Sequence, residues 1–296
     1  MKKILYTLLF IHLLFLGKAQ KTNPYIKSIN DWHKTRIADL KTPNGWLNLE
    51  GLFWLHKGIN SFGNKEGSDC KYNNLEFPAT LGSFIYEGDS VLWVNAANSS
   101  IKVNGAIING VTPIKVFSKI EQGITMSWSH FSWTIIKRED KIGVRCRNLN
   151  AKTLTNFKGI DRFAVDSNWR LKAVMVAPEQ NTLMITNVLG QTTATKTAGK
   201  LLFNYNNKEY SLDVIDEGGP NLFIVFADAS SGKTTYGAGR FIDIPKPDAL
   251  GNTEIDFNKA YNPPCAFTAF ATCPLPPAQN RLTLNITAGE KNYGNH

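Results

Sequence analysis

The stretch ITMSWSHFSWTII, residues 124–136, indicates the fold class of this chain. Its residues alternate between two sides of an extended chain, with one side holding Met126, Trp128, His130 and Ser132, and the other Ser127, Ser129, Phe131 and Trp133. Alternation with a period of two is typical of a β-strand. The stretch therefore predicts a single strand that has one wet face or lines a cleft.

Short apolar runs separated by turn signals continue on both sides of this stretch. They lie at residues 82–94, 101–111, 133–146, 181–189, 200–205, 208–215, 221–227, 240–244, 253–257 and 281–287. Asn104-Gly105 and Asn109-Gly110 predict hairpin turns, because Asn and Gly tolerate positive φ. No second long helix is expected, which excludes a βαβ repeat. The predicted fold is mainly β, an antiparallel sandwich or a barrel-like β domain.

One amphipathic helix is expected near the start, in SINDWHKTRIADLK, residues 28–41. Its residues at helical spacing are Ile29, Trp32, Arg36, Ile37 and Leu40. Ser28 or Asn30 could cap the helix, and Pro43-Asn44-Gly45 would end it. His33 on this helix is interpreted as a surface residue.

The first 19 residues have the pattern of a secretory signal peptide. Lys2 and Lys3 precede an apolar run from Ile4 to Gly17, and small residues flank a cleavage point after Ala19. The run is shorter than the about 20 residues that span a bilayer. We therefore expect an exported protein, periplasmic or extracellular, with no stable membrane insertion after cleavage.

Residues 20–296 are expected to form one family domain, mainly β. Two β units divided near residues 148–156 are the alternative. The precursor has a net charge of +9, but its basic residues are scattered. Nucleic-acid binding requires a basic cluster, so nucleic acid is not expected as a partner. Attraction to small anions stays open.

Several common chemistries are not indicated. Gly232-Lys233-Thr234 resembles the end of a phosphate-binding loop, but the first glycine of that motif is replaced by Ala227. We interpret residues 228–235 as a turn between two antiparallel strands, in which Asp228 can bond the turn amides and Gly232 can adopt positive φ. The histidines and cysteines lack metal-binding spacing, and neither a nucleotide nor a flavin fingerprint occurs. No metal or cofactor is therefore expected.

The segment YNPPCAFTAFATCPLPPAQNR, residues 261–281, is unusually rich in proline and cysteine. Its prolines fix φ and remove backbone donors, so it cannot be a central strand. Cys265 and Cys273 could form a bridge, worth roughly 2.5 kcal/mol in the chain-entropy model. Cys70 and Cys146 would then be a second pair or free thiols, and the sequence does not choose among the pairings.

Five segments together resemble the domain of unknown function family 1684. They are GWLNLEGLFWLHKGINSFG (45–63), FKGIDRFAVDSNWR (157–170), NVLG (187–190), FADASSGKTTYGAGRFI (226–242) and IDFNKAYNPPCAFTAFATCPLPPAQNRLTLNITAGEK (255–291). The resemblance extends roughly from Trp32 to Tyr293. It implies that the C-terminal block is the signature of the family, and it supplies no catalytic residue.

A polar pocket beside the proline-rich segment is the candidate site. Its predicted ligand-binding residues are Arg240, Asp256, Asn258, Tyr261, Arg281 and Glu290. Such a set could bind a small anionic or carbohydrate ligand. Two alternatives remain: a hydrolase that uses Asp256 or Glu290 for acid–base chemistry, and an envelope scaffold in which these charges only pair with the arginines.

Overall fold

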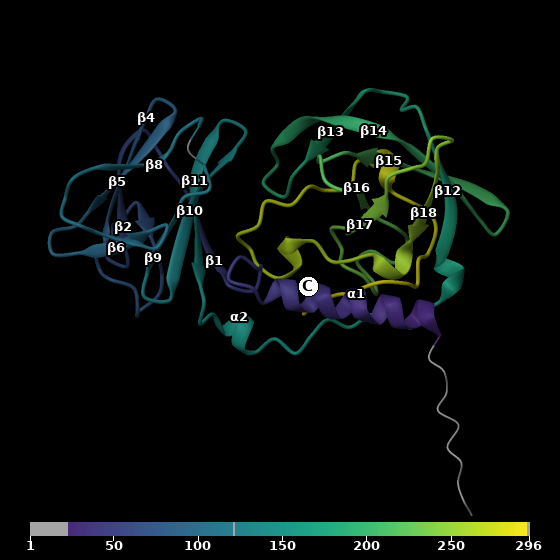
Figure 1. Cartoon of the computed structure of the whole chain (residues 1–296), viewed down its shortest axis with the longest axis horizontal. Coiled ribbons are helices and arrows are strands. Elements are labelled where there is room, and N and C mark those ends of the chain that lie inside the picture. The colour runs from purple at the N-terminus through teal and green to yellow at the C-terminus, as the bar shows by residue number, and fades with distance from the viewer. Residues whose placement is uncertain (1–22, 121, 295–296) are drawn as a thin grey trace, which may run out of the picture.

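The computed structural model describes residues 23–120 and 122–294, so the predicted signal peptide at residues 1–19 lies outside the described residues. Strands hold 44% of the residues and helices 12%, which confirms the mainly β fold. Figure 1 shows two β lobes, with the long helix α1 running beneath the larger one.

The elements follow one another in a simple order. They are α1 (Pro24–Leu40), β1 (Leu49–Trp54), β2 (Gly58–Gly63), β3 (Cys70–Lys71), β4 (Gly82–Glu87), β5 (Ser90–Asn95), β6 (Ser100–Val103), β7 (Ala106–Asn109), β8 (Ile114–Phe117), β9 (Thr125–Trp128), β10 (Phe131–Arg138), β11 (Lys141–Asn148), α2 (Lys152–Thr155), η1 (Ser167–Trp169), β12 (Arg170–Val176), β13 (Thr182–Thr186), β14 (Thr192–Tyr205), β15 (Lys208–Ile215), β16 (Asn221–Phe226), β17 (Arg240–Pro245), β18 (Asn252–Asp256), η2 (Phe257–Lys259), η3 (Pro264–Ala266) and η4 (Ala278–Asn280).

The N-terminal lobe, residues 49–148, consists of two sheets around one apolar core. One sheet has the strand order β1-β11-β10-β9-β6-β7 and the other β3-β2-β4-β5-β8. Pairing is antiparallel except between β2 and β3. Trp93 and Trp133 come from opposite sheets, and their ring centroids lie 5.8 Å apart in this core. The lobe is therefore a sandwich held together by aromatic packing.

The stretch 124–136 is a hairpin, so the prediction of a single strand is wrong. Trp128 pairs with Phe131, and Ser129 between them adopts a φ of 53°. The turn resets the alternation, which brings Met126 and Trp133 into register and buries both in the same core. The pattern identified β structure correctly but gave no signal for the reversal at a serine.

The C-terminal lobe is built on a nearly closed, barrel-like sheet with the strand order β17-β16-β15-β14-β12-β18, and β13 pairs with β14. Its apolar core includes Phe203, Ile224, Ile242 and Phe257. The long loops after β18 pack against this sheet and run back toward the N-terminal lobe (Figure 1). The sheet and these loops together form one wall of the site described below.

Helix α1 confirms the expected helix but begins earlier than predicted. Asn23 caps it by accepting a hydrogen bond from the amide of Tyr25, and Pro24 occupies the first turn. Proline suits this position because its missing amide would be unpaired there anyway. Ile29 and Leu40 are buried, as their spacing predicted.

Two other local predictions had different outcomes. Asn104-Gly105 forms the β6–β7 hairpin, with φ values of 47° and 87°. The hairpin predicted at Asn109-Gly110 is wrong, since β7 and β8 belong to different sheets. The strand predicted at residues 281–287 is also wrong, because this segment pairs irregularly with residues 227–229.

The chain passes from the first lobe to the second through residues 149–169, which include α2 and η1. A division into two β units near residues 148–156 stays a prediction. Within the described ranges, no helix has the length and apolar character needed to cross a bilayer.

Candidate functional site

The turn between β16 and β17 confirms the interpretation of the sequence GKT as a loop. The Asp228 carboxylate accepts a hydrogen bond of 2.7 Å from the amide of Ser230, and Gly232 has a φ of 76°. A short turn with bonded amides presents no helix N-terminus to a phosphate. The segment instead directs Asp228 into the core of the C-terminal lobe.

Arg240, the first predicted site residue, is fully buried. Its Nη2 donates to Asp228 Oδ2 at 2.7 Å, and its Nη1 donates to the carbonyl oxygen of Ala288 at 2.5 Å. Burial lowers the pKa of Arg240, and the Asp228 carboxylate opposes that shift. These contacts attach the C-terminal segment to β17, so the role of Arg240 is structural.

Glu290 is also buried, at 1% exposure. Its Oε2 accepts a hydrogen bond of 2.7 Å from the amide of Asn262, and its Oε1 lies 3.5 Å from Nε of Arg36. Burial raises the pKa of Glu290, while the Arg36 guanidinium acts in the opposite direction. Glu290 thus links helix α1 to the proline-rich segment.

Asp256 and Asn258 lie in a second network, at the start of α1. The Tyr25 hydroxyl donates to Asp256 Oδ1 at 2.9 Å, and the Asn258 side-chain amide donates to the carbonyl oxygen of Asp166 at 2.8 Å. Burial, followed by the Asp256 charge, raises the pKa of Tyr25. This network fastens the first turn of the helix to β18 and η2.

Tyr261 contacts Arg36 of the Glu290 network through its ring, whereas Arg281 belongs to neither network. Tyr261 donates to Asp243 Oδ2 at 3.0 Å, and the guanidinium carbon of Arg36 lies 4.7 Å from the centre of its ring. Arg281 is exposed to solvent. The six predicted residues therefore do not surround one hollow, and Tyr261 is the member of the set that lines the cavity described next.

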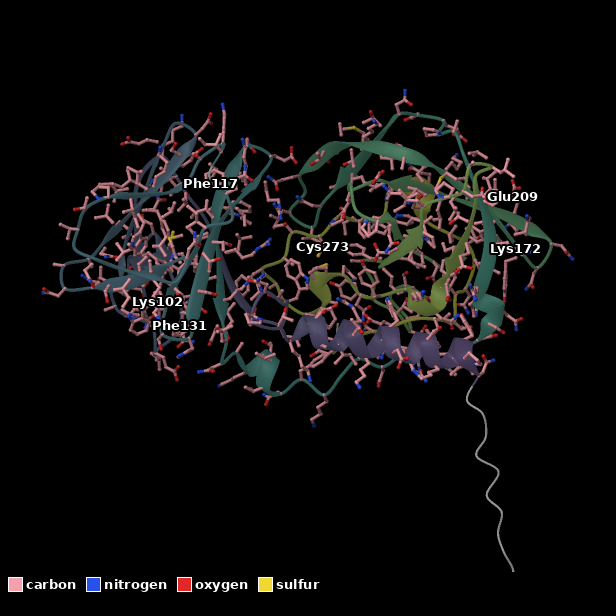
Figure 2. The ribbon with its side chains drawn as sticks, viewed as in Figure 1. Lys102, Phe117, Phe131, Lys172, Glu209 and Cys273 are labelled. Atoms are coloured by element: carbon pink, nitrogen blue, oxygen red, sulfur yellow. The ribbon has the colours of Figure 1, made fainter. Side chains whose placement is uncertain are left out.

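A cavity of about 410 Å³ lies where the two lobes and α1 meet. Figure 2 shows Cys273, one of its lining residues, between the lobes. The cavity is lined by Arg36, Trp46, Arg138, Arg145, Glu217, Phe223, Phe241, Tyr261, Pro264, Ala271, Thr272, Cys273 and Pro274. The proline-rich segment thus forms one wall, as predicted for a site wall, although the facing side chains are different ones.

Arg145 is the most unusual lining residue, because it is only 9% exposed and its buried Nε has no hydrogen-bond partner among the described residues. Its guanidinium carbon lies 5.4 Å from the ring centre of Trp46. Burial, with smaller contributions from the like charges of Arg138 and Arg147, lowers the pKa of Arg145 to about 10. At neutral pH the side chain stays charged, within a positive environment.

Two more arginines face the same cavity. Arg138 donates from Nε to the Thr272 hydroxyl at 3.1 Å, and Arg36 donates from Nη2 to the carbonyl oxygen of Asn262 at 2.8 Å. Glu217 is the acidic member of the lining and is exposed. The charged side chains of the lining are thus three arginines and one glutamate, and the Arg36 charge is in addition paired with Glu290 behind the cavity wall.

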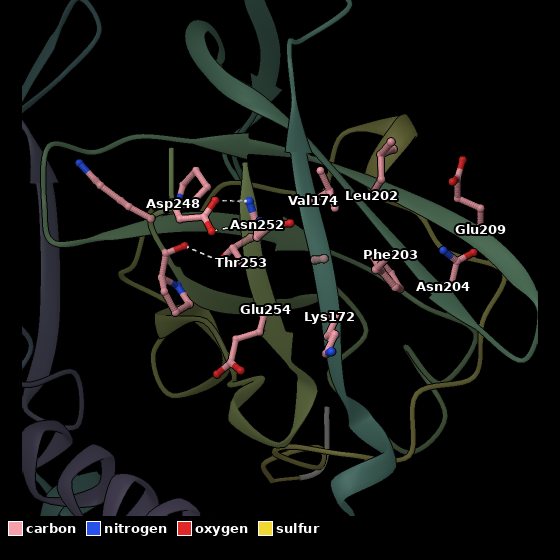
Figure 3. Close-up of a pocket in the computed structure, with 14 residues that line it drawn as sticks. Lys172, Val174, Leu202, Phe203, Asn204, Glu209, Asp248, Asn252, Thr253 and Glu254 are labelled. Carbon is pink, nitrogen blue, oxygen red and sulfur yellow. Dashed lines mark hydrogen bonds between the residues drawn. The ribbon is translucent and has the colours of Figure 1, made fainter. Parts of the chain in front are cut away.

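A larger hollow of about 930 Å³ lies on the face of the C-terminal sheet (Figure 3). Two hydrogen bonds join groups of its lining: Asn252 donates to Asp248 at 3.0 Å, and Thr253 donates to the carbonyl oxygen of Pro245 at 2.8 Å. Glu254 is held by Arg170 through two hydrogen bonds. None of its charged lining residues is buried, in contrast to Arg145 in the smaller cavity, so its size does not make it the better site.

The sequence contained part of the signal for the arginine-lined cavity. In β11, Ile142, Val144 and Cys146 enter the sandwich core, so Arg145 and Arg147 fall on the opposite face. Alternation alone would place them together on a presumed solvent face. That this face is covered by the second lobe depends on contacts more than 100 residues away in sequence, such as the Arg138–Thr272 bond, which spans 134 positions.

A metal centre finds no support in the described ranges, where no group of three or more His, Cys, Asp or Glu side chains could hold an ion. All four cysteines are free thiols in the structure.

Comparison with known proteins identifies a family for the C-terminal part of the chain. Residues 155–291 match the model described as "Protein of unknown function (DUF1684)". This range is narrower than the predicted Trp32–Tyr293, and residues 45–63 lie outside it. A search of curated proteins finds no match.

One solved structure is similar to part of the chain. It is a solution NMR structure of an uncharacterised protein from Haloarcula marismortui, 25% identical, covering 46% of this chain and 78% of its own, with a TM-score of 0.39. The match over residues 155–291 supports the resemblance of this chain to the DUF1684 family of proteins of unknown function.

Proposed function

We propose that this protein binds a small anionic ligand in the cavity between its lobes. The observation that supports this proposal most directly is Arg145, a buried cation that lines the same cavity as Arg36 and Arg138 and whose Nε has no hydrogen-bond partner among the described residues.

A buried charge is costly unless it is paired or fully hydrogen-bonded. The nearest charges to Arg145 include Arg138 and Arg147, which add repulsion rather than compensation. A carboxylate or phosphate in the cavity would supply the missing charge and accept bonds from the guanidinium fork. The volume of about 410 Å³ falls within the range of small-molecule sites.

The aromatic walls add a second requirement for the ligand. Trp46, Phe223, Phe241 and Tyr261 line the same cavity. Such rings contact flat or apolar groups closely. An organic acid or phosphate ester with a nonpolar portion therefore suits this cavity better than a bare inorganic ion.

The alternatives from the sequence receive less support. Asp256 and Glu290 are both buried and neither lines the cavity, so neither is placed to accept a proton from a ligand bound there. A scaffold role stays open for the networks around Arg240 and Glu290, and it is compatible with ligand binding elsewhere in the molecule.

Binding can be tested by thermal unfolding with citrate, phosphate and, as neutral probes, glucose and N-acetylglucosamine. An anion present at 100 times its Kd stabilises the folded state by about 2.7 kcal/mol. Multivalent anions also stabilise proteins nonspecifically by exclusion from their surface. The decisive comparison is therefore between wild type, Arg145→Met and the surface control Arg170→Gln.

The proposal requires that citrate or phosphate raise the melting temperature of wild type and Arg170→Gln more than that of Arg145→Met. Equal anion responses in all three proteins would refute it. A response to the neutral sugars alone would instead support the carbohydrate alternative.

Export is a separate part of the proposal, supported by the pattern of residues 1–19. N-terminal sequencing of protein recovered outside the cytoplasm should begin at Gln20. Recovery of uncleaved chain from the cytoplasm alone would contradict this part.

A further inference from the structure

Two cysteines meet beside the cavity, in the proline-rich segment. The backbone amide of Cys265 lies 3.0 Å from Sγ of Cys273, and the two side chains are also hydrogen-bonded to each other. Prolines flank both residues, since Pro264 precedes Cys265 and Pro274 follows Cys273. Because proline fixes φ, the two sulfurs are brought together by a stiff loop.

The two thiols have different environments. Cys265 is partly exposed, and hydrogen bonds from the Cys273 thiol and the Tyr236 hydroxyl lower its pKa. Cys273 is 4% exposed, and its bond to Cys265 together with burial raises its pKa. An accessible thiol with a stabilised thiolate beside a buried one is the arrangement of an attacking and a resolving cysteine.

The remaining cysteines provide an internal comparison. Cys70 and Cys146 are both buried in the core of the N-terminal lobe, and burial raises the pKa of each. Neither has the exposure or the hydrogen-bond donors of Cys265. Reactivity toward oxidants should therefore be confined to the C-terminal pair.

We propose that Cys265 and Cys273 form a redox-active dithiol that closes to an intrachain disulfide, with Cys265 as the attacking residue. The oxidant is a low-molecular-weight disulfide. The Cys265 thiolate attacks one of its sulfurs and expels one thiolate, which leaves a mixed disulfide on Cys265. Cys273 then loses its proton and attacks the Cys265 sulfur, which expels the second thiolate. Two protein thiols are oxidised, and one external disulfide is reduced to two thiols.

The bridge would close the loop that carries Thr272, whose hydroxyl accepts the hydrogen bond from Arg138. The redox state of the pair therefore bears directly on the cavity wall. The bridge itself forms or fails to form independently of any ligand, so its test is separate from that of anion binding.

The experiment uses the folded mature chain incubated with oxidised glutathione, followed by alkylation of the remaining thiols, proteolysis and mass spectrometry. Wild type should lose two of its four thiols and yield a linked peptide containing residues 265 and 273. Cys70 and Cys146 should stay reduced. Before oxidation, Cys265 should be alkylated at least about tenfold faster than Cys146, because only the former has an accessible thiolate.

Two variants assign the order of attack. Cys273→Ser should retain a glutathione adduct on Cys265, because no resolving thiol is present, whereas Cys265→Ser should take up little glutathione. Circular dichroism checks that both variants fold. The proposal is refuted if Cys265 and Cys273 both remain alkylatable in oxidised wild type, or if Cys265→Ser captures glutathione as readily as Cys273→Ser.

Discussion

Replacing Arg145 with methionine should make the protein more stable while removing its response to anions. The pKa of Arg145 is lowered from 12.5 to about 10, chiefly by burial. For a base, a lowered pKa in the folded state means that its charged form is disfavoured by folding. The buried charge of Arg145 therefore reduces the stability of the folded protein at neutral pH, where the side chain is charged in both the folded and the unfolded state. This loss of stability disappears only above the pKa of Arg145 in the unfolded chain.

The size of the effect follows from this shift. A difference of about 2.5 pKa units corresponds to roughly 3 kcal/mol, taken as an upper limit. Methionine also forfeits the contact between the guanidinium and the Trp46 ring, worth about 1 kcal/mol. Its flexible thioether can fill much of the same space. The net gain should be about 1–2 kcal/mol, or a rise of roughly 2–8 °C in melting temperature.

The assay is thermal and urea unfolding in a buffer without multivalent anions. Arg147→Met is the matched control, because Arg147 lies on the same face of β11 but donates to the carbonyl oxygen of Gly45 and the side chain of Asn48. Its loss leaves these acceptors unpaired and should destabilise the fold. If Arg145→Met proves less stable than wild type by 1 kcal/mol or more, the buried charge of Arg145 does not destabilise the ligand-free protein, and the prediction is refuted.

Three further predictions concern stability. Asp228→Asn should cost about 3–5 kcal/mol in urea unfolding, because it leaves the buried Arg240 unpaired; a loss below 1 kcal/mol would contradict the importance of this pair. Burial and the Arg162 charge lower the pKa of His33 to about 4, so the stability of the folded protein should fall as pH drops from 6.5 toward 4. In a pH series of melting temperatures, His33→Gln should remove the part of this fall that comes from protonation of His33. Gly239→Ala should destabilise by more than about 2 kcal/mol, since φ is 91° and a Cβ would lie 2.5 Å from a backbone oxygen of β16; a neutral effect on the melting temperature would contradict this.

Local patterns predicted the elements of this fold better than their ends or their partners. The spacing of Ile29 and Leu40 correctly indicated α1. The helix begins earlier than predicted, because Asn23 caps it and Pro24 occupies its first turn. The alternation in residues 281–287 does reflect burial, since Leu282 and Ile286 enter the core. It does not reflect a strand, because the backbone of this segment pairs with a turn.

The candidate site was predicted less well, for a physical reason. Glu290 does contact the proline-rich segment, through the amide of Asn262, but the sequence does not reveal whether charged groups near each other compensate one another or face a cavity. Arg145 and Arg138 appeared as ordinary basic residues of a hairpin. Their burial arises from the packing of one lobe on another, which no local pattern encodes.

The cavity combines two parts of the chain that differ in their relation to the family. Three of its four aromatic rings, Phe223, Phe241 and Tyr261, lie within residues 155–291, whereas Trp46 and the three arginines of the lining come from the sequence ahead of that range. The matched range thus contributes a largely uncharged part of the cavity lining, and the preceding segment contributes the positive charge of the cavity. Exchanging that leading segment for another would therefore change the charge of the cavity without altering any residue of the matched range.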